Sequence, residues 1–128
     1  LNGVGEDYRL RDEDGGICCG RPMLMAGRKD AAEQMIRKNT DIIKASGASV
    51  LLVSCPICYR IFKEKYELEG IEVLHHTEYI DRIVSDGMIT MTHTGRKYVY
   101  HDPCELGRGT GIYDEPRRVL SLLGTLEA

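Results

Sequence analysis

The fold of this chain is predicted most directly by residues 50–58, which read VLLVSCPIC. The first four residues form a continuous apolar run of the kind found in strands buried on both faces of a parallel sheet. Pro56 is favoured in the first turn of a helix. Aromatic residues recur behind it at helical spacing as far as Gly70, which we expect to end the helix. The stretch therefore predicts a strand that leads directly into a helix, with Cys55 and Cys58 at the junction.

The same alternation of strand and helix continues on both sides of this stretch. Helices are predicted at 30–46, 55–70, 77–87 and 114–124, strands at 50–53, 71–75 and 97–101, and a loop or weak strand at 88–96. We expect Thr77 to cap the third of these helices. The order predicts an α/β fold, a small three-layer sandwich with a parallel sheet of three to four strands flanked by helices.

Length and composition narrow the class of protein. The 128 residues, 42% of them hydrophobic, suit a single α/β domain covering 1–128, with a loop or disordered end at 1–16. The net charge of −3 argues against binding to nucleic acid. The longest apolar runs are about one strand long, so no transmembrane segment is expected. Because the chain begins with Leu1, we interpret it as an excised fragment.

Five cysteines are the informative part of the composition. Cys18 and Cys19 are adjacent, Cys55 and Cys58 form a Cys-x-x-Cys pair, and Cys104 stands alone. An odd count in a chain rich in helix and strand patterns favours reduced thiols in the cytoplasm over a secreted disulfide framework. The thiols are then available for metal binding or catalysis.

Strand and helix positions predict where these thiols lie. In open α/β sheets, sites form beyond the carboxyl ends of the strands, so Cys55 and Cys104 are expected at the same sheet edge. Cys58 follows Cys55 by one helical turn at a helix N-terminus, whose positive end favours thiolates. A Cys-x-x-Cys pair alone occurs in zinc sites, in thiol redox sites and by chance. The residues by themselves leave these alternatives open.

The combination of motifs is more specific. The chain places Cys18-Cys19-Gly20 upstream of Cys55-Pro56-Ile57-Cys58 at a spacing that resembles the cysteine-rich CCG domain of heterodisulfide reductase and of glycolate oxidase iron–sulfur subunits. Residues 101–109, HDPCELGRG, resemble the opening of a second repeat, with Glu105 where a histidine is common. The resemblance implies that the chain runs from the end of one repeat into the start of the next.

The resemblance also implies a function. It suggests an iron–sulfur oxidoreductase domain that performs electron transfer or disulfide reduction within a larger dehydrogenase or heterodisulfide reductase-like protein. A 4Fe-4S type cluster would be held by Cys18, Cys19, Cys55 and Cys58, with Cys104 as a fifth candidate ligand. The implied partner is a flavin-containing dehydrogenase or another iron–sulfur subunit, through which the protein could lie peripheral to a membrane. For the isolated fragment, which is expected to be inactive, zinc or no metal stay open as alternatives to that cluster.

Two alternatives remain at this point, a structural zinc module with four cysteines and a metal-free Cys-x-x-Cys thiol–disulfide domain. No other catalytic residue is assigned. His75, His76 and His101 are interpreted as structural residues, and Asp102 as fixing the turn before Pro103. We expect Arg21 and Arg108 to hold a carboxylate or to neutralise an anionic cluster, and 107–111 to be a flexible turn. The apolar run 23–25 is interpreted as core or interface, and its exposure in a fragment would favour a homo-oligomer.

Overall fold

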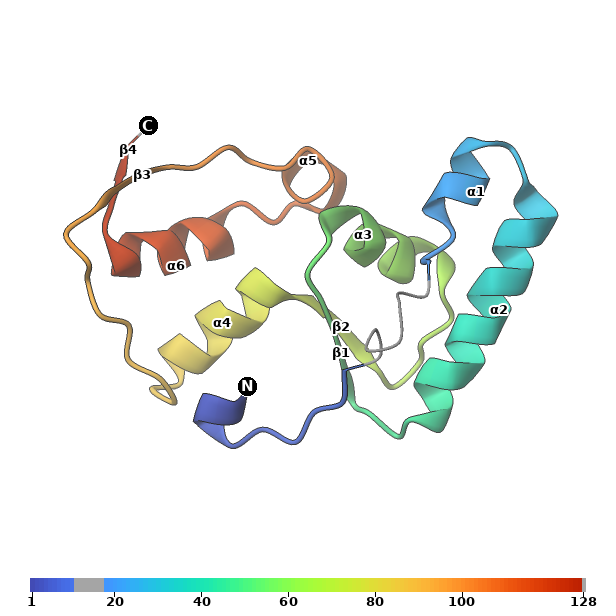
Figure 1. Cartoon of the computed structure of the whole chain (residues 1–128), viewed down its shortest axis with the longest axis horizontal. Coiled ribbons are helices and arrows are strands. Elements are labelled where there is room, and N and C mark those ends of the chain that lie inside the picture. The colour runs from blue at the N-terminus through green and yellow to red at the C-terminus, as the bar shows by residue number, and fades with distance from the viewer. Residues whose placement is uncertain (11–17, 128) are drawn as a thin grey trace. The chain divides into compact units, whose positions relative to one another are not determined.

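The computed structural model describes residues 1–10 and 18–127, which divide into two compact units (Figure 1). We call Arg9–Leu74 the cysteine-rich unit, and Leu1–Tyr8 together with His75–Ala128 the second unit. Within the expected loop at 1–16, Asn2–Val4 form a short 3₁₀ helix, and 11–16 lie outside the described residues. The single domain expected over 1–128 stays a prediction.

The cysteine-rich unit contains three helices and the strand that joins them. Its elements are α1 (Arg21–Met25), α2 (Lys29–Ala45), β1 (Val50–Val53) and α3 (Pro56–Lys65), and β2 (Glu72–His75) runs to its boundary. The predicted strands at 50–53 and 71–75 and the helix at 30–46 are confirmed to within a residue. Among the described residues of this unit, α1 is the one helix that was not predicted, and it lies where a turn was expected.

The core of this unit forms around the second cysteine. Cys19, Ile61, Tyr66 and Leu68 are buried together, and apolar side chains of α1, α2 and β1 pack against them. The helix that begins at Pro56 ends at Lys65 and not at Gly70 as predicted. Tyr66 adopts extended backbone, with φ −100° and ψ 135°, and its ring is buried in the core. Packing of Tyr66 in the core therefore ends this helix before the chain reaches Gly70.

The described part of the second unit contains three α-helices and a pair of short strands. It contains α4 (His76–Ser85), β3 (Lys97–Val99), α5 (Gly107–Thr110), α6 (Asp114–Leu123) and β4 (Thr125–Glu127). The cap of α4 is His75 and not Thr77, since the imidazole accepts from the backbone N–H of Thr77 while Glu78 accepts from the N–H of His75. His75 is only 2% exposed, which confirms its structural role.

The strands pair differently from the prediction. The described strands form two separate two-stranded parallel sheets, β1 with β2 and β3 with β4, in place of one sheet of three to four strands. Tyr98 of β3 lies opposite Leu126 of β4, a strand that the sequence did not indicate. Because Lys97 and Val99 are exposed on either side of Tyr98, β3 is buried on one face only. Such a strand lacks the apolar faces that a central strand of a parallel sheet needs.

Among the described residues, no helix is both long enough and apolar enough to cross a bilayer.

Candidate metal centre

The Cys18-Cys19-Gly20 turn is shaped by its glycine. Gly20 has φ +92°, a left-handed conformation that side-chain-bearing residues rarely adopt, and it precedes the first residue of α1. This conformation points the Gly20 N–H back at the sulfur of Cys18, 3.4 Å away. The turn leaves Cys18 exposed, whereas Cys19 is only 5% exposed.

Two buried polar side chains hold the backbone of this turn. The amide nitrogen of Asn39 donates to the carbonyl of Cys18 at 3.0 Å, and the hydroxyl of Tyr66 donates to the carbonyl of Cys19 at 3.1 Å. Asn39 also donates to the hydroxyl oxygen of Tyr66 at 3.0 Å. The sequence analysis missed both residues. A signal was present, because Asn39 falls on the apolar face of α2 between Ile36 and Ile43.

The second cysteine pair lies at the start of α3. Cys55 is the N-cap residue in extended conformation, its carbonyl accepts from the N–H of Tyr59 at 2.9 Å, and Pro56 occupies the first turn. Cys55 is exposed, and Cys58 is half-buried one turn into the helix. The predicted strand-to-helix junction is therefore confirmed.

The thiol of Cys58 interacts with thiols from both motifs. Burial raises the pKa of Cys58 first, and hydrogen bonding and charge interaction with Cys19 and then with Cys55 raise that pKa further. The expectation that the helix N-terminus favours a thiolate is wrong for Cys58. In the metal-free chain, burial and the neighbouring thiols act against the thiolate form of Cys58. The contacts bring Cys19, Cys55 and Cys58 together from two separate segments.

The environment of the Tyr66 hydroxyl includes Cys18, the remaining thiol of this unit. Burial raises the pKa of the Tyr66 hydroxyl most, the hydrogen bond from Asn39 lowers it, and the thiols of Cys19, Cys18 and Cys58 raise it. Cys18 and Cys58 therefore both lie within electrostatic range of the same buried phenol. Cys19 and Cys58 therefore lie in or against the core, and the exposed Cys18 and Cys55 lie near members of it.

The chemistry of this donor set can be compared with the groups that it might hold. Among the described residues, no three His, Cys, Asp or Glu side chains converge as ligands of a single ion. A tetrahedral zinc site with Zn–S bonds of about 2.3 Å needs its sulfurs within roughly 3.8 Å of one another. In a cluster, by contrast, the cysteines bind different irons, so they need not share one ion. The four thiols of this unit are free, and thiolates are ligands of both zinc and iron–sulfur clusters.

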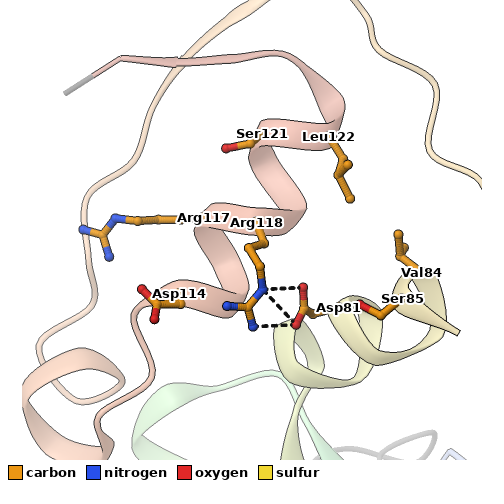
Figure 2. Close-up of a pocket in the computed structure, with 8 residues that line it drawn as sticks. All are labelled: Asp81, Val84, Ser85, Asp114, Arg117, Arg118, Ser121 and Leu122. Carbon is orange, nitrogen blue, oxygen red and sulfur yellow. Dashed lines mark hydrogen bonds and ion pairs between the residues drawn. The ribbon is translucent and has the colours of Figure 1, made fainter.

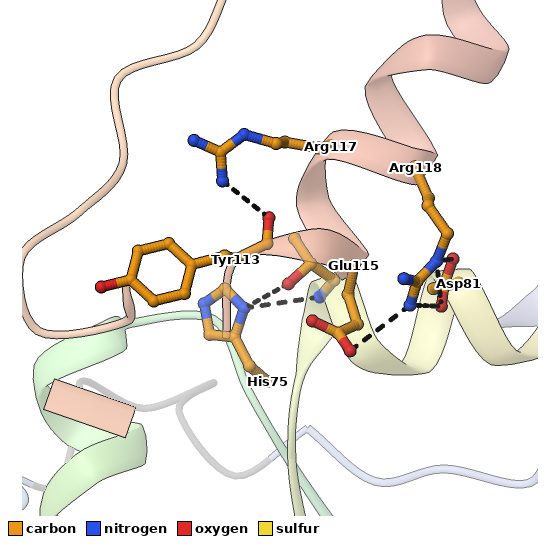
Figure 3. A network of polar contacts seen from close by, with 7 residues as sticks. His75, Asp81, Tyr113, Glu115, Arg117 and Arg118 are labelled. Carbon is orange, nitrogen blue, oxygen red and sulfur yellow. Dashed lines mark hydrogen bonds and ion pairs between the residues drawn. The ribbon is translucent and has the colours of Figure 1, made fainter. Parts of the chain in front are cut away.

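Cys104 belongs to the second unit, in the loop after β3. Arg117 forms an ion pair with Asp102. It also donates to the carbonyl of Tyr113 at 3.0 Å (Figure 3). The ion pair ties the Asp102 side chain to α6, and the role expected for Asp102 in the turn before Pro103 stays a prediction. Because β3 pairs with β4 and not within the sheet of β1, the sheet-edge argument for joining Cys104 to Cys55 is wrong.

The glycine-rich segment at 107–111 is more ordered than the flexible turn predicted there. Gly107–Thr110 form the short helix α5, and Gly107 is buried beneath the ring of Tyr113. A Cβ at Gly107 would lie 2.5 Å from Tyr113 Cε1, so this glycine is needed for close packing. The segment has a structural role in the loop that carries Cys104.

The second unit also contains a groove between two of its helices. Side chains of α4 and α6 line it, including Asp81, Ser85, Asp114 and Leu122 (Figure 2). Arg118 at its edge is held by Asp81 at 2.6 Å and by Glu115 at 3.3 Å. No cysteine lines the groove, and its charged pair joins the two helices.

Comparison with known proteins identifies the family of the cysteine-rich unit. The fold and the thiols define the class of this protein, which has mixed helices and strands and a cysteine-rich centre. Residues 6–63 match the family model of the CCG cysteine-rich domain, and this part of the chain belongs to that family. No solved structure matches the chain.

The curated relatives are longer proteins. The chain is 35% identical over 130 residues to one of the subunits of dihydromethanophenazine:CoB–CoM heterodisulfide reductase of Methanosarcina acetivorans, covering 94% of this chain and 32% of that protein. It is 34% identical to one of the subunits of the fumarate reductase (CoM/CoB) of Methanothermobacter marburgensis, covering 89% of this chain and 23% of that protein. It is 29% identical to the probable iron–sulfur-binding oxidoreductase FadF of Bacillus subtilis, covering 76% and 14%. The chain thus spans about a third or less of these relatives.

Proposed function

We propose that this chain is an iron–sulfur domain of a larger oxidoreductase, with Cys18, Cys19, Cys55 and Cys58 as ligands of a 4Fe-4S type cluster. The observation that carries the proposal is the gathering of the Cys19, Cys55 and Cys58 thiols from two distant motifs in one unit. Thiolates are the ligands that such clusters require.

The burial of the site supports the same function. Thiols that lie close together disfavour one another's ionisation when no cation is present. The positive charge of a bound metal offsets the repulsion between the thiolates, so coordinated thiols are deprotonated. An iron–sulfur cluster at this position would supply reversible transfer of single electrons. The chain's part is to hold the cysteines, to bury one side of the site against Tyr66 and Ile61, and to direct the Gly20 N–H at a ligand sulfur.

The relatives support a role in a multi-subunit reductase. Their names describe a heterodisulfide reductase subunit, a fumarate reductase subunit and an iron–sulfur-binding oxidoreductase. By analogy, we propose electron transfer or disulfide reduction in the cytoplasm, with a flavin-containing dehydrogenase or another iron–sulfur subunit as partner. Cys104 is proposed as a fifth ligand.

The test is the iron and acid-labile sulfide content of the chain purified anaerobically from iron-supplied cells. We expect iron with sulfide, and loss of both in Cys19→Ser and Cys58→Ser. Cys104→Ser is prepared in parallel, and a loss of iron there would make Cys104 a ligand. Zinc without sulfide would overturn the proposal in favour of a structural zinc module. Protein that takes up neither metal would overturn it in favour of a thiol–disulfide domain.

A further inference from the structure

We propose that Tyr66 and Asn39 are positioning residues that set the strength of the hydrogen bond to the Cys18 sulfur, and through it the reduction potential of the bound cluster. The statement about the potential depends on the function proposed above. The statement about the hydrogen bond does not, because it concerns contacts of the chain alone.

The first step concerns the backbone of Cys19. Each peptide unit is planar, so fixing its carbonyl also fixes the plane. Asn39 holds the carbonyl of Cys18 and Tyr66 holds the carbonyl of Cys19, so the two peptide planes that flank the Cys19 Cα are both held. Together they determine φ and ψ of Cys19, and hence the direction of its Cα–Cβ bond. The buried cysteine is oriented by side chains that lie 21 and 47 residues away from the two cysteines.

The second step concerns the peptide between Cys19 and Gly20. Its carbonyl accepts from the Tyr66 hydroxyl at 3.1 Å, and its N–H donates to the Cys18 sulfur at 3.4 Å. A hydrogen bond at the oxygen of an amide polarises the group and makes its N–H a stronger donor. Asn39 donates in turn to the Tyr66 oxygen at 3.0 Å, which strengthens the phenol as a donor. The contacts therefore form one relay from Asn39 through Tyr66 and this peptide to the sulfur.

The third step concerns the cost of this arrangement. Asn39 is 5% exposed, and its Oδ1 has no hydrogen-bond partner among the described residues. A buried polar group with an unpaired acceptor is less favourable than an apolar side chain of similar shape. The amide is explained by its two donated bonds, which converge on the cysteine turn.

The fourth step links the relay to electron transfer. Reduction of a cluster adds negative charge to its sulfurs, and an N–H donor at a ligand sulfur stabilises that charge. Hydrogen bonds to the sulfurs are among the factors that set cluster potentials. Weakening the Gly20 N–H donor should therefore make the potential more negative, and strengthening the phenol donor should make it less negative.

The experiment compares Tyr66→Phe with wild-type protein and with Tyr59→Phe as the matched control. Tyr59 is also a buried tyrosine of this unit, but its hydroxyl accepts from Lys63 Nζ of the same helix at 3.2 Å. A further variant carries 3-fluorotyrosine at position 66. This side chain retains the ring, and its hydroxyl is a stronger donor. This protein keeps the test decisive if Tyr66→Phe does not fold.

Two measurements separate this inference from the proposed function. In the metal-free protein, the Gly20 amide proton should shift upfield and exchange roughly 10-fold faster in Tyr66→Phe, move in the opposite direction with 3-fluorotyrosine, and stay unchanged in Tyr59→Phe. In the iron-loaded protein, the midpoint potential should become more negative with phenylalanine and less negative with fluorotyrosine. The electron paramagnetic resonance signal should show the same type of cluster in all of these proteins.

The outcomes are distinguishable. A Gly20 amide that responds as expected in a protein that never binds iron would refute the proposed function and retain the relay. A protein that binds a cluster, but whose Gly20 amide is the same in wild-type, Tyr66→Phe and the 3-fluorotyrosine protein, would overturn the relay and retain the function. A responding amide with an unchanged potential would overturn the role assigned to the relay in electron transfer.

Discussion

At the scale of single residues, the cysteines differ in their access to solvent. Cys18, Cys55 and Cys104 are exposed, Cys58 is half-buried, and Cys19 is buried. The two cysteines within one motif therefore differ in how far they are buried. The exposed members can meet a reagent or a partner, while Cys19 is reached only when its surroundings open.

The first prediction concerns alkylation of the native metal-free protein. Iodoacetamide should modify the three exposed cysteines first, and Cys19 roughly 10-fold or more slowly, because local opening must precede its reaction. Mass spectrometry of peptides taken over time measures the order. Denatured protein serves as the control, in which all five cysteines should react at similar rates. Equal rates in the native protein would contradict the burial of Cys19.

The second prediction concerns pH. The pKa of Cys58 is raised in the folded state, so folded protein holds a proton there that unfolded protein loses above the ordinary thiol pKa of about 8.5. The folded state then binds more protons than the unfolded state, and the free energy of unfolding falls as pH rises. The contribution of the protonated Cys58 thiol to the free energy of unfolding is fully present below about pH 8 and declines above it.

Urea unfolding of the metal-free protein between about pH 7 and about pH 10 measures this dependence. Cys58→Ala should show a shallower decline than wild-type protein. A wild-type stability that is constant or rises over this range would contradict the prediction.

At the scale of elements, α1 and the cysteine turn depend on a left-handed glycine. Gly20→Ala should cost about 1 kcal/mol because alanine is strained at φ +92°. Gly27 has φ +71° with nothing near its missing Cβ, so Gly27→Ala is a matched control for strain alone. Both variants should lose similar stability in urea.

Only the turn variant should affect the metal centre. Gly20→Ala should lower the iron content of reconstituted protein, because the N–H that faces Cys18 is displaced. Gly27→Ala should keep the wild-type content. Equal iron content in the two variants would show that the geometry of the turn does not matter for the site.

At the scale of the whole molecule, the chain divides its cysteines between two units. Four lie in the cysteine-rich unit, and Cys104 lies in the second unit, on a loop held by Asp102 and Arg117. The metal is predicted to stabilise the first of these units directly, since ligand binding protects the segments that supply its ligands.

Hydrogen exchange with and without iron measures this effect. Amides of α1, of the cysteine turn and of the start of α3 should exchange more slowly in the loaded protein. Slower exchange at 101–107 as well would add Cys104 to the site. Protection confined to the second unit would contradict the assignment of the four ligands.

Local sequence patterns were sufficient to predict most of the secondary structure. The continuous apolar run at 50–53 predicted β1, helical spacing predicted α2 and α6, and Pro56 predicted the start of α3, because these features depend on near neighbours in the chain. The cysteine motifs also indicated the family of residues 6–63, since ligand type and spacing are properties of the sequence.

The remaining features required the tertiary structure, because they depend on segments that are distant in the chain. Strand pairing is one of them, and it separated β3 from β1 where local patterns predicted a single sheet. The environment of Cys58 is another, since burial and the Cys19 thiol reversed the effect expected from its own helix. The Asn39 and Tyr66 bonds to the cysteine turn span 21 and 47 residues, so no local pattern could reveal them.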